Sequence, residues 1–154
     1  MKVPRELEMK ILTQAGLAKP ARPKNRPTFS LLESSSGNWS ITLALRCTVA
    51  SEANKRDHWA VKKRRGDAQR EELALALKLA RLADHKVPLP VVVTWTRIGK
   101  QMLDDDNLSG SFKALRDKLA EWLGVDDGDT AAVSWKEEQR QGEPGVEVTI
   151  QNRE

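Results

Sequence analysis

The spacing of hydrophobic and polar positions predicts the order of strands and helices along the chain. Residues 39–47 alternate apolar and mostly polar side chains, which is typical of a half-buried strand. Residues 91–98 form a β-branched run that favours an inner strand. Residues 131–135 and 146–150 predict two closing strands, joined by a polar turn around residues 142–145.

Two stretches between these strands carry helical spacing. Leucines are dense over residues 67–83 and predict a helix with a well-buried face, which Asp67 would cap at its amino end. Residues 108–123 predict a second helix, with Asn107 as its amino-terminal cap and Gly124 where a carboxyl-terminal cap belongs. The order strand, helix, strand, helix, strand, strand predicts an α+β domain with helices on one side of a mixed sheet.

The first 38 residues have a different character. Residues 3–15 place apolar side chains at four-residue intervals, which predicts a short helix that must pack against something to be stable. In residues 18–27 three prolines alternate with four cations, so an extended basic linker is expected. The 154 residues therefore divide into an amino-terminal segment, 1–38, and one domain, 39–154.

Composition narrows the class of protein. The single cysteine, Cys47, excludes an internal disulfide and a zinc site built on thiolate pairs, and it points to a reducing compartment. No stretch approaches the roughly 20 apolar residues that span a bilayer, and the amino terminus lacks the apolar run of a secretory signal. We expect a cytoplasmic protein with no membrane partner.

Two acidic clusters flank the second predicted helix, at residues 104–106 and 126–129. On an extended segment the side chains of Asp104 and Asp106 point the same way, so their carboxylates can converge on one hard cation, Mg²⁺ or Mn²⁺. Such an ion can activate water against a phosphodiester. The alternative is that the first cluster simply caps the helix and favours its first turn, and that the second is a solvated turn.

Positive charge is also concentrated, although the formal net charge of the chain is only +4. The cations are most dense in the sequence around Trp59. This cluster predicts contacts to DNA phosphates, and the alternative is that it forms a solvated face. Trp59 would stack on exposed bases or, as is more usual for tryptophan, pack into the core. Phosphate contacts are expected from the following cations: Lys55, Arg56, Lys62, Lys63, Arg64, Arg65, Arg97 and Lys100.

The acidic region resembles the RusA family of Holliday junction resolvases, which is found in phages and prophages. The residues that carry the resemblance are Asp-x-Asp-Asn-Leu at 104–108, Lys-x-x-x-Asp at Lys113 and Asp117, and Gly-Val-Asp-Asp at 124–127. The strand at 40–43, followed by Ser51 and Asn54, is similar to the opening part of that family. The resemblance covers residues 39–150.

The resemblance implies a magnesium-dependent homodimeric endonuclease that cuts four-way DNA junctions, with a RusA-like fold. It assigns the essential metal-binding aspartates to Asp104, Asp106 and Asp127. Gly110 stands where the family often has a lysine, and Lys113 replaces that lysine after a short insertion at 109–111. Lys113 would then contact the scissile phosphate or stabilise the leaving oxygen, or it is an ordinary surface lysine.

The two acidic clusters are far apart along the predicted helix, so their aspartates need a further arrangement to meet at one ion. A helix over residues 109–123 would separate the two acidic clusters by roughly 20 Å at 1.5 Å per residue. Asp127 would reach the other two aspartates across a dimer interface or through an unwound turn at 109–111. The alternatives to a nuclease are a non-catalytic DNA-binding or partner-binding module and a calcium-stabilised structural module.

Overall fold

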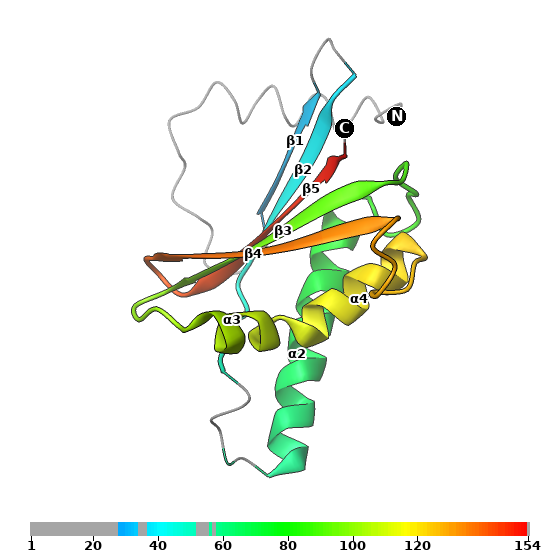
Figure 1. The fold of residues 1–154 in the computed structure, drawn as a ribbon. Helices are drawn as coiled ribbons and strands as arrows, with labels where there is room; N and C mark the ends of the chain where they lie inside the picture. The colour runs from blue at the N-terminus through cyan, green and yellow to red at the C-terminus, as the bar shows by residue number, and fades with distance from the viewer. Residues whose placement is uncertain (1–27, 34–36, 52–55, 57, 154) are drawn as a thin grey trace.

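The computed structural model describes residues 28–33, 37–51, 56 and 58–153. Within these residues, five strands form one sheet with the order β1-β2-β5-β3-β4 (Figure 1). Strands β3 and β4 are parallel, and the other neighbouring pairs are antiparallel. The elements are β1 (Thr28–Glu33), β2 (Trp39–Leu45), α2 (Trp59–Leu79), β3 (Val91–Gly99), α3 (Asp105–Ser111), α4 (Lys113–Leu123), β4 (Val133–Gln141) and β5 (Gly145–Asn152).

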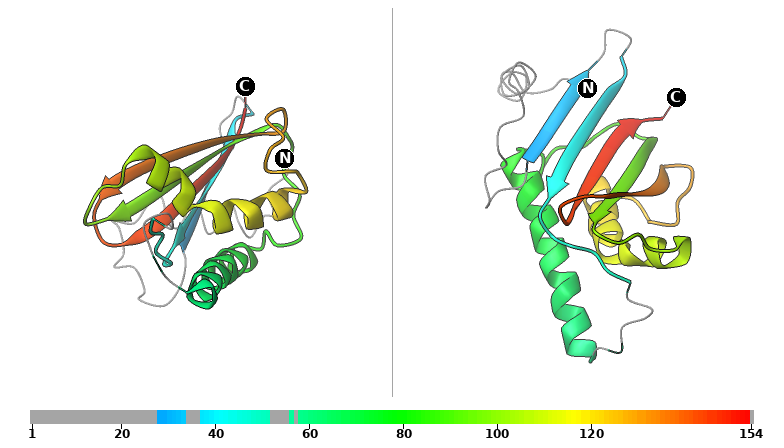
Figure 2. Two further views of the ribbon diagram at one scale, coloured as in Figure 1. Left: turned by 60° about the horizontal axis from the view of Figure 1, so that its bottom comes forward. Right: turned by 90° about the vertical axis from the view of Figure 1, so that its left-hand side faces the viewer.

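The three described helices cover one face of the sheet, as Figures 1 and 2 show. Burial alternates strictly along β2, so its apolar residues face the helices. On the other face Thr42 and Thr149 share a hydrogen bond of 3.1 Å between their hydroxyl oxygens. The predicted α+β class with a mixed sheet is confirmed.

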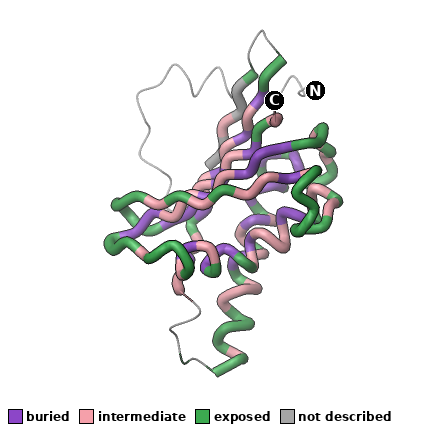
Figure 3. The backbone as a smooth tube through the Cα atoms, in the orientation of Figure 1, coloured by how far each residue is buried: buried purple, intermediate pink, exposed green. Residues whose placement is uncertain are grey.

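The core lies between the sheet and the helices, where the buried residues gather (Figure 3). Trp95 of β3 stacks on Phe112, the residue between α3 and α4, with ring centroids 5.8 Å apart. Arg116 anchors α4 to β4, because it pairs with Glu137 and lies 5.7 Å from the centroid of the Trp135 ring. These contacts fix the helical layer that follows β3 against the edge of the sheet.

Several predicted elements agree with the structure. The strands over 39–47, 91–98 and 146–150 and the turn around 142–145 are present as β2, β3, β5 and the turn before it. The strand predicted over 131–135 is present as β4, but β4 begins at Val133 and continues to Gln141. Gly124 ends α4 in the left-handed conformation with φ 72°, as its position predicted. Cys47 is partly buried against the core.

Other predicted boundaries are wrong. Helix α2 begins at Trp59 rather than Asp67, and the side chain of His58 caps it by accepting from the amide of Ala60 at 3.2 Å. Its first turns project beyond the sheet and are mostly exposed (Figure 3), so they carry no apolar period. The ion pair between Lys63 and Asp67, 2.8 Å, spans four residues of this projecting part.

The second predicted helix is divided at Phe112 into α3 and α4. Strand β1 was not predicted, and it pairs with β2 although it precedes the boundary drawn at residue 39. The sheet therefore begins within the segment that the sequence set apart. The helix expected over 3–15, the linker over 18–27 and the cation Lys55 lie outside the described residues.

In the part of the chain that the structure describes, no helix combines the length and the apolar character that crossing a bilayer requires.

Candidate acidic loop and nucleic-acid interface

The first acidic cluster follows a short loop at the carboxyl end of β3. Gln139 of β4 holds this loop with two hydrogen bonds to the backbone of Leu103. Its Nε2 donates to the carbonyl of Leu103 at 2.6 Å, and its Oε1 accepts from the amide at 2.8 Å. Arg97 adds a donor bond of 2.6 Å from Nη1 to the carbonyl of Gln101. The loop before Asp104 is thus tied to β4 at Leu103 and to β3 at Gln101.

Asp104 is the amino-terminal cap of α3, because its carboxylate accepts from the amide of Asn107 at 2.9 Å. The prediction that Asn107 caps the helix is wrong. Asp104 has extended backbone, whereas Asp105 and Asp106 already belong to the first turn. The strand alternation expected to align Asp104 with Asp106 therefore does not apply, although all three aspartates are exposed.

The side chain of Asn107 has a different role. Its Oδ1 accepts a hydrogen bond from the hydroxyl of Ser51, which lies in the segment after β2. Ser51 and Asn107 are both among the residues that carry the family resemblance. This contact places the segment after β2, which contains Ser51, next to the first turn of α3.

The second acidic cluster lies at the other end of the helical layer. Two of its carboxylates shape the turn: that of Asp126 accepts from the amide of Gly128 at 2.9 Å, and that of Asp129 accepts from the amide of Ala131 at 3.1 Å. Asp127 contributes its backbone carbonyl to the indole of Trp135 at 2.8 Å, and it is exposed. Of the three acids, Asp127 is the one whose carboxylate is not used by this turn.

The structure does not bring Asp127 to Asp104 and Asp106 within one chain. Strands β3 and β4 pair in parallel from Val91 opposite Val133 to Gly99 opposite Gln141. The loop after β3 and the loop before β4 therefore lie at opposite ends of a strand pair roughly 25 Å long at 3.3 Å per residue. No group of three or more potential metal-binding side chains is present among the described residues. Because residues 105–111 are helical, closure through an unwound turn at 109–111 is wrong.

The predicted cations lie mainly on α2. Lys62, Lys63 and Arg64 are exposed on its projecting part, and Arg65 follows them in the same helix. Trp59 in its first turn is 70% exposed, so the expectation of a core position is wrong. Arg56 and Lys100 are also exposed. Arg97 differs, because it is half-buried and donates to backbone carbonyls.

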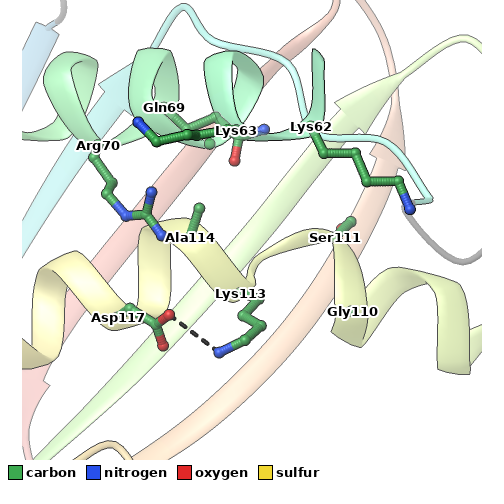
Figure 4. Close-up of a pocket in the computed structure, with 10 residues that line it drawn as sticks. Lys62, Lys63, Gln69, Arg70, Gly110, Ser111, Lys113, Ala114 and Asp117 are labelled. Atoms are coloured by element: carbon green, nitrogen blue, oxygen red, sulfur yellow. Dashed lines mark hydrogen bonds and ion pairs between the residues drawn. The ribbon is translucent and has the colours of Figure 1, made fainter. Parts of the chain in front are cut away.

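Lys113 begins α4 and pairs with Asp117 at 3.1 Å, so the Lys-x-x-x-Asp motif forms an exposed ion pair across one helical turn. It lines a pocket between α2 and α4 together with Lys62, Lys63 and Arg70 (Figure 4). The pocket is a feature of tertiary packing. Sequence spacing gave no sign that Lys113 and Arg70 share a surface.

Gln139 is the residue that sequence reasoning missed. Residues 133, 135, 137 and 139 alternate along β4, and Val133, Trp135 and Glu137 all lie toward the helices or the core. This alternation was the available signal, since it places Gln139 on the same face.

Comparison of the chain with protein-family models and with curated proteins finds no match.

Proposed function

We propose that this protein is a structure-selective DNA endonuclease of RusA type that uses Mg²⁺ or Mn²⁺ to hydrolyse phosphodiesters in branched DNA. The acidic loop, defined as residues 100–106 from the end of β3 to the first turn of α3, carries the proposal. Gln139 and Arg97 hold its backbone, yet the carboxylates of residues 104–106 stay exposed. A held backbone with accessible oxygen ligands is what a hard divalent cation requires. The resemblance of residues 39–150 to RusA resolvases supplies the reaction.

Asp104 and Asp106 would supply oxygen ligands for the ion, and the exposed cations on α2 would bind the flanking backbone. The ion would supply a nucleophilic water and neutralise charge on the phosphoryl group. Asp104 can hold the helix and a cation together, because a carboxylate oxygen has more than one lone-pair site. Recognition would rest on shape and charge rather than on base edges.

Asp127 would complete the site across a homodimer. One chain separates it from the first cluster, so a two-fold related copy would place the Asp127 of one subunit beside Asp104 and Asp106 of the other. Such a dimer carries two equivalent sites, which suits paired cuts in a four-way junction. Mixing Asp104→Asn chains with Asp127→Asn chains should restore cleavage in mixed dimers, since half of their sites are intact; no recovery contradicts the shared site.

The central experiment is cleavage of a labelled four-way junction in Mg²⁺. The unmodified protein should produce paired nicks, and Asp106→Asn and Asp127→Asn should abolish them. Asp105→Asn is the matched control, because Asp105 is an exposed acid of the same helical turn that the proposal leaves out of the site. No cleavage by the unmodified protein contradicts the endonuclease. Equal loss in all three variants contradicts the assignment of Asp106 and Asp127 to its site.

One observation favours a second function, a non-catalytic DNA-binding module on this fold. Asp104 already caps α3, and in capping a helix an aspartate needs no metal. This alternative predicts a shifted band with junction DNA and no nicks. A calcium-stabilised structural module predicts metal-dependent melting without cleavage or binding.

A further inference from the structure

A pocket of about 340 Å³ opens between α2 and the helical layer formed by α3 and α4 (Figure 4). We propose that it binds a backbone phosphate of DNA, at a position distinct from the acidic loop. This inference deepens the proposed endonuclease by assigning a site to a non-scissile phosphate. The lining residues are Lys62, Lys63, Gly66, Gln69, Arg70, Gly110, Ser111, Lys113, Ala114 and Asp117.

The charge of the residues that line the pocket favours an anionic ligand. Four of the lining side chains are cationic and only one, Asp117, is a carboxylate. The cations come from two helices that are separate in sequence, so their convergence is a product of the fold. Arg70 reaches toward α4, while Lys113 projects from the start of α4 (Figure 4). A group with negative charge distributed over several oxygens can contact both helices at once.

The neutral polar side chains of the pocket are already used by the protein. Gln69 is buried and donates to the carbonyl of Thr48 at 3.0 Å. Ser111 is buried and donates to the carbonyl of Leu108 at 2.6 Å. The donors that remain for a ligand are therefore mainly ammonium and guanidinium groups, which favours an anion over a neutral molecule.

Three of the cations pair with acids that are partly exposed rather than buried. Asp67 accepts from Lys63 at 2.8 Å and from Arg70 at 3.3 Å, and these hydrogen bonds lower the pKa of its carboxyl. Lys113 is 77% exposed in its pair with Asp117. Exposed ion pairs are weak, so a phosphate can compete for these cations while the acids keep them oriented.

Two of the residues that line the pocket are glycines within helices. A Cβ at Gly66 would lie 3.3 Å from Nη1 of Arg70, which is closer than most side-chain contacts. A Cβ at Gly110 would meet no atom within 4 Å, so a side chain there enters open space. Glycine inside a helix is unfavourable relative to alanine. Its use at two positions that line one pocket is consistent with room for a ligand.

The location suits the DNA backbone. Gly110 is five residues along α3 from Asp105, roughly 8 Å at 1.5 Å per residue. A strand whose scissile phosphate lies at the acidic loop would therefore bring another phosphate, about two nucleotides away at 3.4 Å of rise per nucleotide, to the pocket. The exposed Lys62 and Lys63 leave the rim open to a continuous polymer rather than enclosing a mononucleotide.

The test uses the full chain with Asp106→Asn as background, so that junction binding is measured without cleavage. Adding Gly110→Glu places a carboxylate in the pocket, and Gly110→Gln places a neutral side chain of similar size there. We expect several-fold weaker binding for Gly110→Glu and a much smaller change for Gly110→Gln. Equal effects of the two substitutions would overturn the proposal, because they would reflect bulk rather than charge.

Arg70→Gln supplies a second measure that does not depend on Gly110. Removing one phosphate contact should lower the slope of log affinity against log salt by about 1. Lys78→Gln, an exposed cation near the other end of α2, is the matched control and should leave the slope unchanged. An unchanged slope in Arg70→Gln, with circular dichroism confirming its fold, overturns the pocket.

Methylphosphonate substitution locates the phosphate. Neutralising one phosphate away from the cut should weaken binding by the parent protein and should have no further effect in Arg70→Gln. Binding of a free mononucleotide in the pocket without an effect on junction binding overturns the assignment to DNA. Cleavage by the unmodified protein is measured separately. If Gly110→Glu weakens junction binding more than Gly110→Gln but the unmodified protein does not cleave, the pocket is supported and only the endonuclease is rejected.

Discussion

Gln139 and Leu103 are joined by a reciprocal pair of hydrogen bonds between a strand side chain and a loop backbone. The amide of Gln139 donates at 2.6 Å and accepts at 2.8 Å, so both backbone groups of Leu103 are satisfied. Leu103 immediately precedes the cap of α3. The side chain therefore couples the edge strand β4 to the position of the acidic loop.

Replacing Gln139 with leucine removes both bonds while keeping a similar side-chain volume. Leaving the Leu103 amide and carbonyl without these partners should lower the free energy of unfolding by about 1–3 kcal/mol. We also expect cleavage to require a higher Mg²⁺ concentration, because the loop loses its support. Urea denaturation and a Mg²⁺ titration of cleavage measure the two effects. Gln141→Leu, an exposed change on the same strand, is the control, and equal effects contradict a positioning role.

Two substitutions of Asp104 should distinguish its role as the cap of α3 from its proposed role as a metal ligand. Asparagine caps helices about as well as aspartate, so Asp104→Asn should keep the free energy of unfolding, whereas Asp104→Ala should lower it by about 0.5–2 kcal/mol. Under the proposed endonuclease both should abolish cleavage, because neither would supply a carboxylate to the ion. Thermal or urea unfolding and the junction assay measure this difference. If Asp104→Asn retains cleavage, Asp104 caps the helix and is not a ligand of the ion.

Trp59 should contribute to binding rather than to folding. At 70% exposure, its replacement by alanine should change the free energy of unfolding by less than about 0.5 kcal/mol. Loss of stacking should weaken junction binding by about 1–3 kcal/mol, and Trp59→Phe should retain most of the affinity. Fluorescence anisotropy with a labelled junction measures the affinity. Leu75→Ala, an exposed apolar change on the same helix, is the control, and an equal loss there excludes stacking.

Cys47 should be unreactive in the folded protein. Burial, with a smaller effect from Glu72, raises the pKa of its thiol from 9.0 to about 12. At pH 8 its thiolate fraction should fall about a thousandfold, three pKa units, so alkylation by iodoacetamide should be far slower than in urea. Because the folded state keeps this proton longer, the free energy of unfolding should fall as the pH rises from about 9 towards 12. Cys47→Ala should lack that fall, and equal alkylation rates with and without urea contradict the burial.

Local patterns were sufficient for the inner elements. Alternation over β2, the β-branched run of β3 and the glycine after α4 each predicted the type of element from the order of neighbouring residues alone. Patterns failed where an element has no buried face of its own. The first turns of α2 lack an apolar period because they project from the domain, and their helical state became apparent only in three dimensions.

The sequence by itself determined the α+β order of the elements and the presence of two acidic clusters on either side of the second predicted helix. Only the tertiary structure decided that Asp104 and Asp127 lie at opposite ends of the sheet and that Arg70 and Lys113 share a pocket. The reason is that strand direction and helix packing depend on contacts between residues remote in the chain. Had β4 run antiparallel to β3, the same sequence spacing would have placed both acidic clusters at one end.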